Sequence, residues 1–167
     1  MTGVIRRGRR DTGGLHRTLR MTPAFISAEE SPSPDRGRLR FTGFKFERSR
    51  SGLCQAECTL AWTDGRAVTG RANGQSSPLG DYRIAAEAAL NAIDGFVVGV
   101  LRFELIGVKA IKAFDANVLI VSILAHRERE ISKLLGCVLA ETDPIKGAAL
   151  SVLNATNRLI GNTISTR

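Results

Sequence analysis

Few residues of this 167-residue chain have types and spacings that suggest chemistry. Cys54 and Cys58 are four residues apart, and with Cys137 or His126 they could supply the ligands of a zinc site. The same spacing also places both thiols on one face of a β-strand among apolar residues, where cysteines are often buried. We favour the core position for these thiols, and we predict no metal site.

Other arrangements typical of enzymes do not occur in the sequence. Glu128 and Glu130 alternate with arginines, a pattern typical of a charged turn rather than of a catalytic carboxylate pair. We find no P-loop, no dinucleotide-binding fingerprint, no H-x-H metal motif and no Ser/His/Asp arrangement. We therefore predict a protein with no catalytic residues and no cofactor.

Charge and composition narrow the class of protein. The net charge is +8, and the first 40 residues hold nine basic and four acidic residues. One Trp and one Tyr leave few side chains on which nucleic-acid bases could stack. Three cysteines make a disulfide framework improbable and favour a reducing compartment. No apolar run reaches the ~18–20 residues that span a bilayer, and no signal peptide is recognisable. These features predict a cytoplasmic protein that does not enter membranes.

The chain divides near residue 37. Residues 1–37 combine Gly, Arg, Ser and Pro, and we predict a disordered basic tail there. The alternatives for this tail are a solvated segment, a sequence translated upstream of a true start at Met21, or an arm that binds acidic partners. Residues 38–161 carry the periodic patterns of a folded domain, and residues 162–167 form a short tail.

Two successive sets of elements follow from the hydrophobic periodicity. The first half is predicted to contain strands over 38–47, 53–62 and 66–72, a loop over 73–78 and a helix over 82–93. A two-residue turn is predicted at Asp64-Gly65. The second half is predicted to contain strands over 102–112, 117–125 and 131–140, and then a helix that Asp143 caps and Gly161 ends.

The two halves are an internal duplication. Residues 41–45 (FTGFK) align with 105–109 (LIGVK), and in both the pattern changes phase at the glycine, as at a β-bulge. Residues 85–92 align with 148–155 with five of eight residues identical. We predict an α+β fold of two βββα units, 38–98 and 99–161, in which one helix covers each antiparallel sheet. Because such sheets leave an edge or a face uncovered, we expect a homodimer.

Small residues line both predicted helices. They are Ala85, Ala86 and Ala89 in the first helix and Gly147, Ala148 and Ala149 in the second. One explanation is close packing of the helices on a sheet or on each other. The other is room for an apolar ligand whose carboxylate is held at a helix N-terminus.

These motifs resemble the C-terminal regulatory domain of 2-isopropylmalate synthase and citramalate synthase. In that family the second helix reads roughly D-x3-A-S-x2-A-x3-A-x-N, and Asp143, Ala155 and Asn157 match it, with small residues at the other positions. Residues 70–74 (GRANG) resemble the family's G-x-G-N-G loop with one alanine for glycine, and the second unit keeps only the first glycine of its own loop. The resemblance covers about residues 38–161.

The resemblance implies a non-catalytic dimerisation domain that binds a branched-chain amino acid or a related keto acid and regulates a partner protein. The catalytic barrel of those synthases is absent from this sequence. The implied ligand-binding residues are Gly70, Ala72, Asn73, Gly74, Gly136, Asp143 and Gly147. The alternative is a nucleic-acid-binding protein that uses the N-terminal arm and basic strand residues, namely Lys45, Arg48, Arg50, Lys109 and Lys112.

Overall fold

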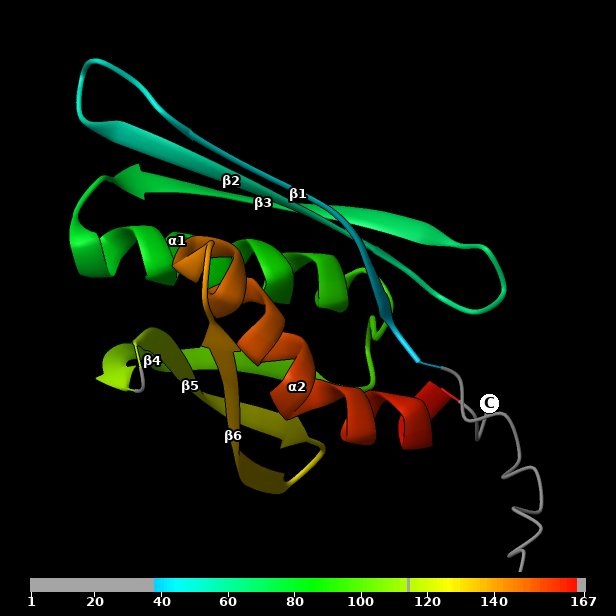
Figure 1. The fold of residues 1–167 in the computed structure, drawn as a ribbon. Coiled ribbons are helices and arrows are strands. Elements are labelled where there is room, and N and C mark those ends of the chain that lie inside the picture. Colours follow the sequence, from blue (N-terminus) through cyan, green and yellow to red (C-terminus); the bar gives the residue numbers. More distant parts are fainter. Residues whose placement is uncertain (1–37, 114, 165–167) are drawn as a thin grey trace, which may run out of the picture. The chain divides into compact units, whose positions relative to one another are not determined.

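A computed structural model of the chain describes residues 38–113 and 115–164, and Figure 1 shows their arrangement. The first unit contains β1 (Arg40–Arg48), β2 (Leu53–Ala61), β3 (Ala67–Gln75) and α1 (Pro78–Asp94). The second contains β4 (Arg102–Ala113), β5 (Ala116–Arg127), β6 (Glu130–Ala140) and α2 (Pro144–Ile164). The predicted α+β fold of two βββα units is confirmed.

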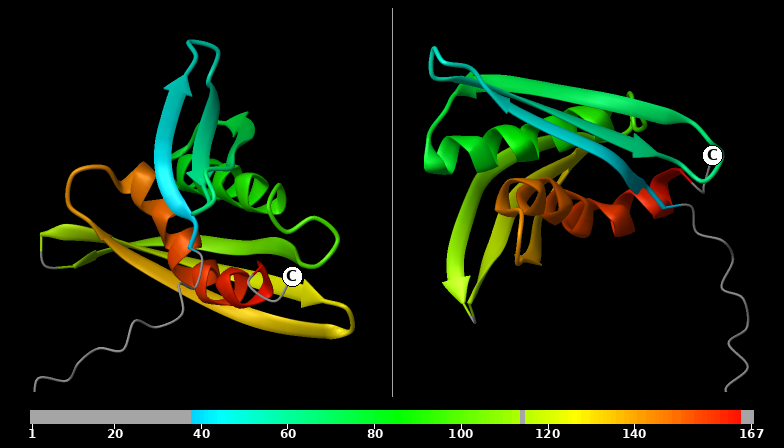
Figure 2. Two further views of the ribbon diagram at one scale, coloured as in Figure 1. Left: turned by 90° about the vertical axis from the view of Figure 1, so that its right-hand side faces the viewer. Right: turned by 45° about the horizontal axis from the view of Figure 1, so that its top comes forward.

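Both helices lie between the two sheets, as Figures 1 and 2 show. Sheet 1 has the order β1-β2-β3 and sheet 2 has the order β4-β5-β6, and all neighbouring strands are antiparallel. Helix α1 packs on β2 and β3 and also on β4, whereas α2 packs on β5 and β6 and also touches β1. Each sheet therefore has an inner face against the helices and an outer face turned away from them.

The two phase changes in the sequence are irregularities of strand pairing. The register of β1 against β2 shifts between Phe41 and Gly43, and that of β4 against β5 shifts between Leu105 and Gly107. One extra residue in one strand reverses the side of the sheet to which later side chains point. Because the shift recurs at the equivalent place, the internal duplication is confirmed in the backbone pairing.

Strand β2 shows why these residues form a half-buried strand. Its inward side chains alternate with outward polar ones, as the sequence predicts. The inward side chains, all at most 2% exposed, are Cys54, Ala56, Cys58 and Leu60. They form part of the core between sheet 1 and the helices, where α1 contributes its alanines.

Strand β3 and the turn before it differ from the prediction. The predicted loop over 73–78 is right only at Ser76 and Ser77, since β3 continues to Gln75, pairing along the whole of β2, and α1 begins at Pro78 and not at the predicted residue 82. The turn at Asp64-Gly65 is not a two-residue turn. The N–H of Gly65 donates to the carbonyl of Trp62 at 3.0 Å, and Gly65 has a φ of 89°. This is a three-residue hairpin loop in which a glycine takes the left-handed position.

Helix α2 also ends later than predicted. It passes Gly161 and continues to Ile164, so residues 162–164 belong to the helix and not to a tail. A glycine inside a helix costs only about 1 kcal/mol relative to alanine, and the preceding Ile160 is fully buried in the core. The predictions for 1–37 and 165–167 lie outside the described residues. Within the described residues, neither helix combines the length and the apolar character needed to cross a bilayer.

Candidate functional site

Two glycines that the resemblance assigns to a ligand site lie against helices. A Cβ at Gly70 would lie 2.7 Å from the carbonyl carbon of Asn91, and closer still to other backbone atoms of α1. A Cβ at Gly136 would lie 2.7 Å from the backbone N of Ala155 in α2. These separations are far below van der Waals contact, so only glycine allows each helix to pack directly on the third strand of its sheet.

An asparagine ties each helix to that same strand. The Nδ2 of Asn91 donates to the carbonyl of Arg71 at 2.8 Å, and the N–H of Cys137 donates to the Oδ1 of Asn154 at 3.3 Å. The two asparagines are equivalent in the duplication. The helix–strand contact thus recurs in both units, and packing alone accounts for the two glycines.

The other five predicted ligand residues are spread over the fold. Ala72 packs against the core, and Gly74 faces α1 from sheet 1. Gly147 lies in the first turn of α2, with Asp143 as its cap accepting an N–H at 2.9 Å. Asn73 is exposed on β3. The structure does not gather the seven residues around either cavity described below, and their ligand role stays a prediction from the resemblance.

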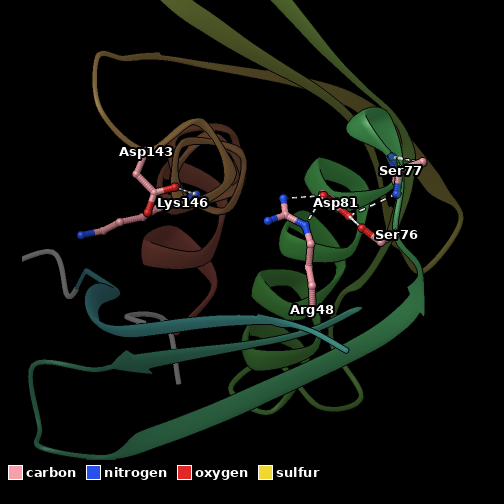
Figure 3. Close-up of polar contacts among 7 residues, drawn as sticks. Arg48, Ser76, Ser77, Asp81, Asp143 and Lys146 are labelled. Atoms are coloured by element: carbon pink, nitrogen blue, oxygen red, sulfur yellow. Dashed lines mark hydrogen bonds and ion pairs between the residues drawn. The ribbon is translucent and has the colours of Figure 1, made fainter. Parts of the chain in front are cut away.

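A polar cluster that the sequence does not predict lies at the start of α1, as Figure 3 shows. The Oδ2 of Asp81 accepts hydrogen bonds from Nε and Nη2 of Arg48 at 2.9 and 2.6 Å. Its Oδ1 accepts from the hydroxyl of Ser76 at 2.9 Å and from the N–H of Ser77 at 3.3 Å. Asp81 is 4% exposed, whereas the Arg48 side chain is half exposed. The cluster joins the end of β1 to the first turn of α1.

Asp81 is held in its ionised form. Burial alone raises the pKa of Asp81, but hydrogen bonds from Arg48, Ser76 and Cys54 outweigh burial and hold this pKa below its usual value. The pKa of the Cys54 thiol is raised, chiefly by burial and then by its interaction with Asp81. Because both carboxylate oxygens already accept hydrogen bonds, Asp81 is a poor candidate for a general base.

A cavity of about 490 Å³ lies beside this cluster, where the first turns of α1 and α2 meet. Figure 3 shows Asp143 at the start of α2 across from the Arg48–Asp81 pair. The cavity is lined by Arg48, Ser76, Ser77, Pro78, Asp81, Tyr82, Pro144 and Ile145.

Both helices begin in the same way beside the cavity. In α1, the cap Ser77 accepts the N–H of Gly80 at 2.9 Å, and a proline takes the first helical position; α2 repeats the arrangement behind Asp143. The first N–H groups of a helix have no acceptor within the helix, and its dipole makes this end positive. The starts of both helices therefore border the cavity, and each start already has a cap that accepts one of its N–H groups.

A second cavity, of about 530 Å³, lies on sheet 1 beside the first hairpin. Arg48 lines this cavity as well, together with Asn73 and the turn after β1. The Arg48 guanidinium also lies 5.0 Å above the ring of Phe46. These contacts hold Arg48 in place, and its half-exposed guanidinium borders both cavities.

The cysteines lie where core packing predicts. Cys54 and Cys58 are free and buried, and burial raises the pKa of Cys58 to about 12. Cys137 and His126 belong to sheet 2, so the imagined zinc ligands are not brought together. Within the described residues, no group of His, Cys, Asp and Glu could hold a metal ion.

The acidic residues at the other hairpin form a turn. Glu128 and Glu130 are exposed at the β5–β6 connection, and Glu128 has a φ of 53°. This is the charged turn that the sequence predicts. The arginine-rich arm lies outside the described residues, and two basic strand residues of the nucleic-acid alternative point to separate surfaces: Lys45 is exposed on sheet 1 and Lys109 on sheet 2.

Comparison with known proteins adds no relative. A scan against protein-family models finds no match, and a search of curated proteins finds none either.

Proposed function

We propose that this protein is a non-catalytic domain that binds a small, branched-chain amino-acid-like carboxylate and dimerises, like the regulatory domain that its sequence resembles. The observation that carries the proposal is the cavity of about 490 Å³ at the two helix starts, with Arg48 in its wall. Its volume is within the range of about 300–1,000 Å³ that is typical of small-molecule sites.

The charges around the cavity suit a carboxylate. Helix N-termini bind anions through backbone N–H groups and the helix dipole, and two such ends meet here. Arg48 uses two of its N–H groups on Asp81, and a guanidinium has five. Asp81 stays ionised and takes two of these N–H groups, so Arg48 retains three for a second carboxylate.

The rest of the lining suits a short apolar side chain. Pro78, Pro144 and Ile145 contribute aliphatic surface, and Tyr82 contributes an aromatic ring with a polar tip. An amino acid with a branched aliphatic side chain, or its 2-oxo acid, would place its carboxylate toward Arg48 and its side chain toward Ile145. We propose that a separate protein responds when the cavity is occupied. We also propose a cytoplasmic location, because free thiols such as Cys54 suit a reducing compartment.

A binding titration tests this proposal directly. Leucine, isoleucine, valine and their 2-oxo acids are added to the full chain, and thermal unfolding and calorimetric heat are followed. One of them should raise the melting temperature by several degrees at 100 times its Kd, since this concentration stabilises by about 2.7 kcal/mol. No saturable response to any of the six compounds would refute the proposal.

Substitution at Arg48 shows whether the cavity is the site. Arg48→Gln should weaken binding about 10–100-fold through loss of a charge-assisted hydrogen bond, and Arg48→Lys should recover part of the affinity. Arg71→Gln is the matched control, because Arg71 also forms an ion pair with a carboxylate, Glu57, at 2.8 Å but lies outside the cavity. Equal affinities of the two glutamine variants would place the ligand elsewhere.

A further inference from the structure

The outer faces of the two sheets differ in chemistry. The outer face of sheet 1 is polar, and its side chains bond to one another across the strands. The hydroxyls of Thr59 and Thr69 are 2.8 Å apart, and Arg71 donates to Glu57 at 2.8 Å. This face has the properties of a surface in contact with water.

The outer face of sheet 2 is apolar. Five of the eight large apolar side chains that are exposed in the described chain belong to it, with Ile131 at 65% and Leu135 at 66% exposure. Together with half-buried side chains of β5, the apolar set is Ile106, Ile111, Val118, Ile120, Leu124, Ile131, Leu135 and Leu139. Contiguous apolar patches of this kind mark interaction sites.

The duplication provides an internal control for this difference. Counting from the equivalent glycines of β3 and β6, Asn73 of sheet 1 corresponds to Leu139 of sheet 2, and Thr69 corresponds to Leu135. The first unit therefore folds with polar residues at the positions where the second unit has leucines. Because the fold does not require apolar residues there, the apolar face needs a different explanation.

We infer that a second copy of this chain covers the outer face of sheet 2, so that two such sheets pack face to face. This inference specifies the surface for the dimerisation in the proposed function. Strands of 11 and 12 residues span ~38 Å at ~3.3 Å per residue, and three strands span ~14 Å. Two such faces bury ~1,100 Å², which exceeds the ~1,000 Å² that a specific interface requires.

The charges on this face suit a second identical face. Glu104 in β4 and Lys133 in β6 both pair with Leu124 in β5, so they stand at opposite ends of one row across the sheet. A two-fold axis along β5 reverses the row in the second copy and sets each carboxylate opposite an ammonium. An axis across the strands sets Glu104 opposite Lys109 instead. Either isologous arrangement sets Glu104, whose carboxylate also lies 3.4 Å from Nε2 of His126 in its own sheet, opposite one lysine of the second copy.

The test replaces two leucines by their sheet 1 counterparts, Leu135→Thr with Leu139→Asn, in the full chain without ligand. Light scattering on a sizing column should give twice 18.0 kDa for the unchanged protein, and dimer association at least ~100-fold weaker for the double variant. The control is Val98→Thr, which changes a 73% exposed residue outside both sheets and should leave the dimer intact. Unfolding curves confirm that each variant folds.

Cys137 reports on the same face, because it lies on β6 between the two leucines and is exposed in the single chain. Its reaction with a thiol reagent should be slow in the dimer and at least ~10-fold faster in the double variant. A dimer that persists in the double variant, or an unchanged protein that is a monomer, overturns the inference. If the protein is a monomer and Cys137 still reacts slowly, the inference is also overturned, and another segment of the same chain covers the face.

Charge reversal provides an independent variant that leaves the apolar residues in place. Glu104→Lys should weaken the dimer, and adding either Lys133→Glu or Lys109→Glu should restore it and identify the axis. No effect of Glu104→Lys, or restoration by neither partner, contradicts the face-to-face arrangement. None of these measurements uses a ligand, so a failed amino-acid titration leaves their outcome standing.

Discussion

Replacing Gly70 with alanine tests the contact on which both units depend. The added Cβ would lie 2.7 Å from the carbonyl carbon of Asn91 and closer still to backbone atoms of Ala88 and Ala92. Carbon atoms in contact are ~3.5–4.0 Å apart. All three neighbours are backbone atoms of one helix, so no side chain can rotate away. Helix α1 must therefore retreat from β3 by roughly 1 Å, and the core between them must open.

The cost of this retreat should be large. Overpacking of a well-packed site typically costs 1–3 kcal/mol and sometimes more, and Gly70→Ala is near the upper end because the obstacle is backbone. We expect a loss of about 3 kcal/mol. With a urea dependence of ~1–3 kcal/mol per molar, the midpoint of unfolding should fall by ~1–3 M. Gly136→Ala should have a similar effect, since its Cβ would meet Ala155 of α2 in the same way.

Gly43→Ala is the matched control. Gly43 also lies in a strand of sheet 1, but its added Cβ would meet only the side chain of Thr59 at 3.5 Å, an ordinary van der Waals distance, and its φ is not positive. It should be neutral or stabilise by ~0.4–1 kcal/mol through the unfolded chain. Urea unfolding followed by circular dichroism measures all three variants. Equal midpoints for Gly70→Ala and Gly43→Ala would refute the helix–strand contact, and a large loss at only one of Gly70 and Gly136 would refute their equivalence.

Three further variants test single features. Asp81→Asn should lower the free energy of unfolding by about 2 kcal/mol at pH 7. Because the pKa of Asp81 is lowered in the folded protein, this loss should be present above about pH 4 and vanish at lower pH, as measured by urea unfolding at each pH. Asp94→Asn should stabilise at pH 7, because burial raises the pKa of Asp94 despite nearby Arg102. That gain should disappear as the pH falls through the raised pKa. Glu128→Gly should raise stability by roughly 0.5–1 kcal/mol in the same assay, since glycine accepts the positive φ at this turn.

The sequence predicts the elements well where one face of each is buried. In β2 the alternation from Cys54 to Leu60 fixes both the strand and its orientation. The glycines 43 and 107 locate the bulges, because a bulge changes the period of the pattern by one residue. The cap at Asp143 follows from local chemistry, since its carboxylate and the N–H that it binds are three residues apart.

The prediction fails where tertiary contacts override local preference. Gly74 and its neighbours are poor strand formers, yet β2 offers them a complete ladder, so β3 extends to Gln75. Arg48 and Asp81 are 33 residues apart, and nothing local connects them. A Ser-Ser-Pro segment followed by an aspartate does indicate a capped helix start, and it could have drawn attention to Asp81. Only the fold shows that this aspartate meets the end of β1.

The duplication also separates what the fold needs from what it leaves free to vary. Both units keep the bulge glycine, the strand glycine and the helix asparagine, and the strand glycine and helix asparagine form the helix–strand contact in each unit. The cluster beside the cavity is not kept: by the alignment of the strands Lys112 stands for Arg48, and, counting from the caps Ser77 and Asp143, Gly147 stands for Asp81. Since glycine has no carboxylate, the second unit cannot repeat the ion pair. We therefore expect one ligand per chain, and a calorimetric stoichiometry of two would show that the cluster is not what defines the site.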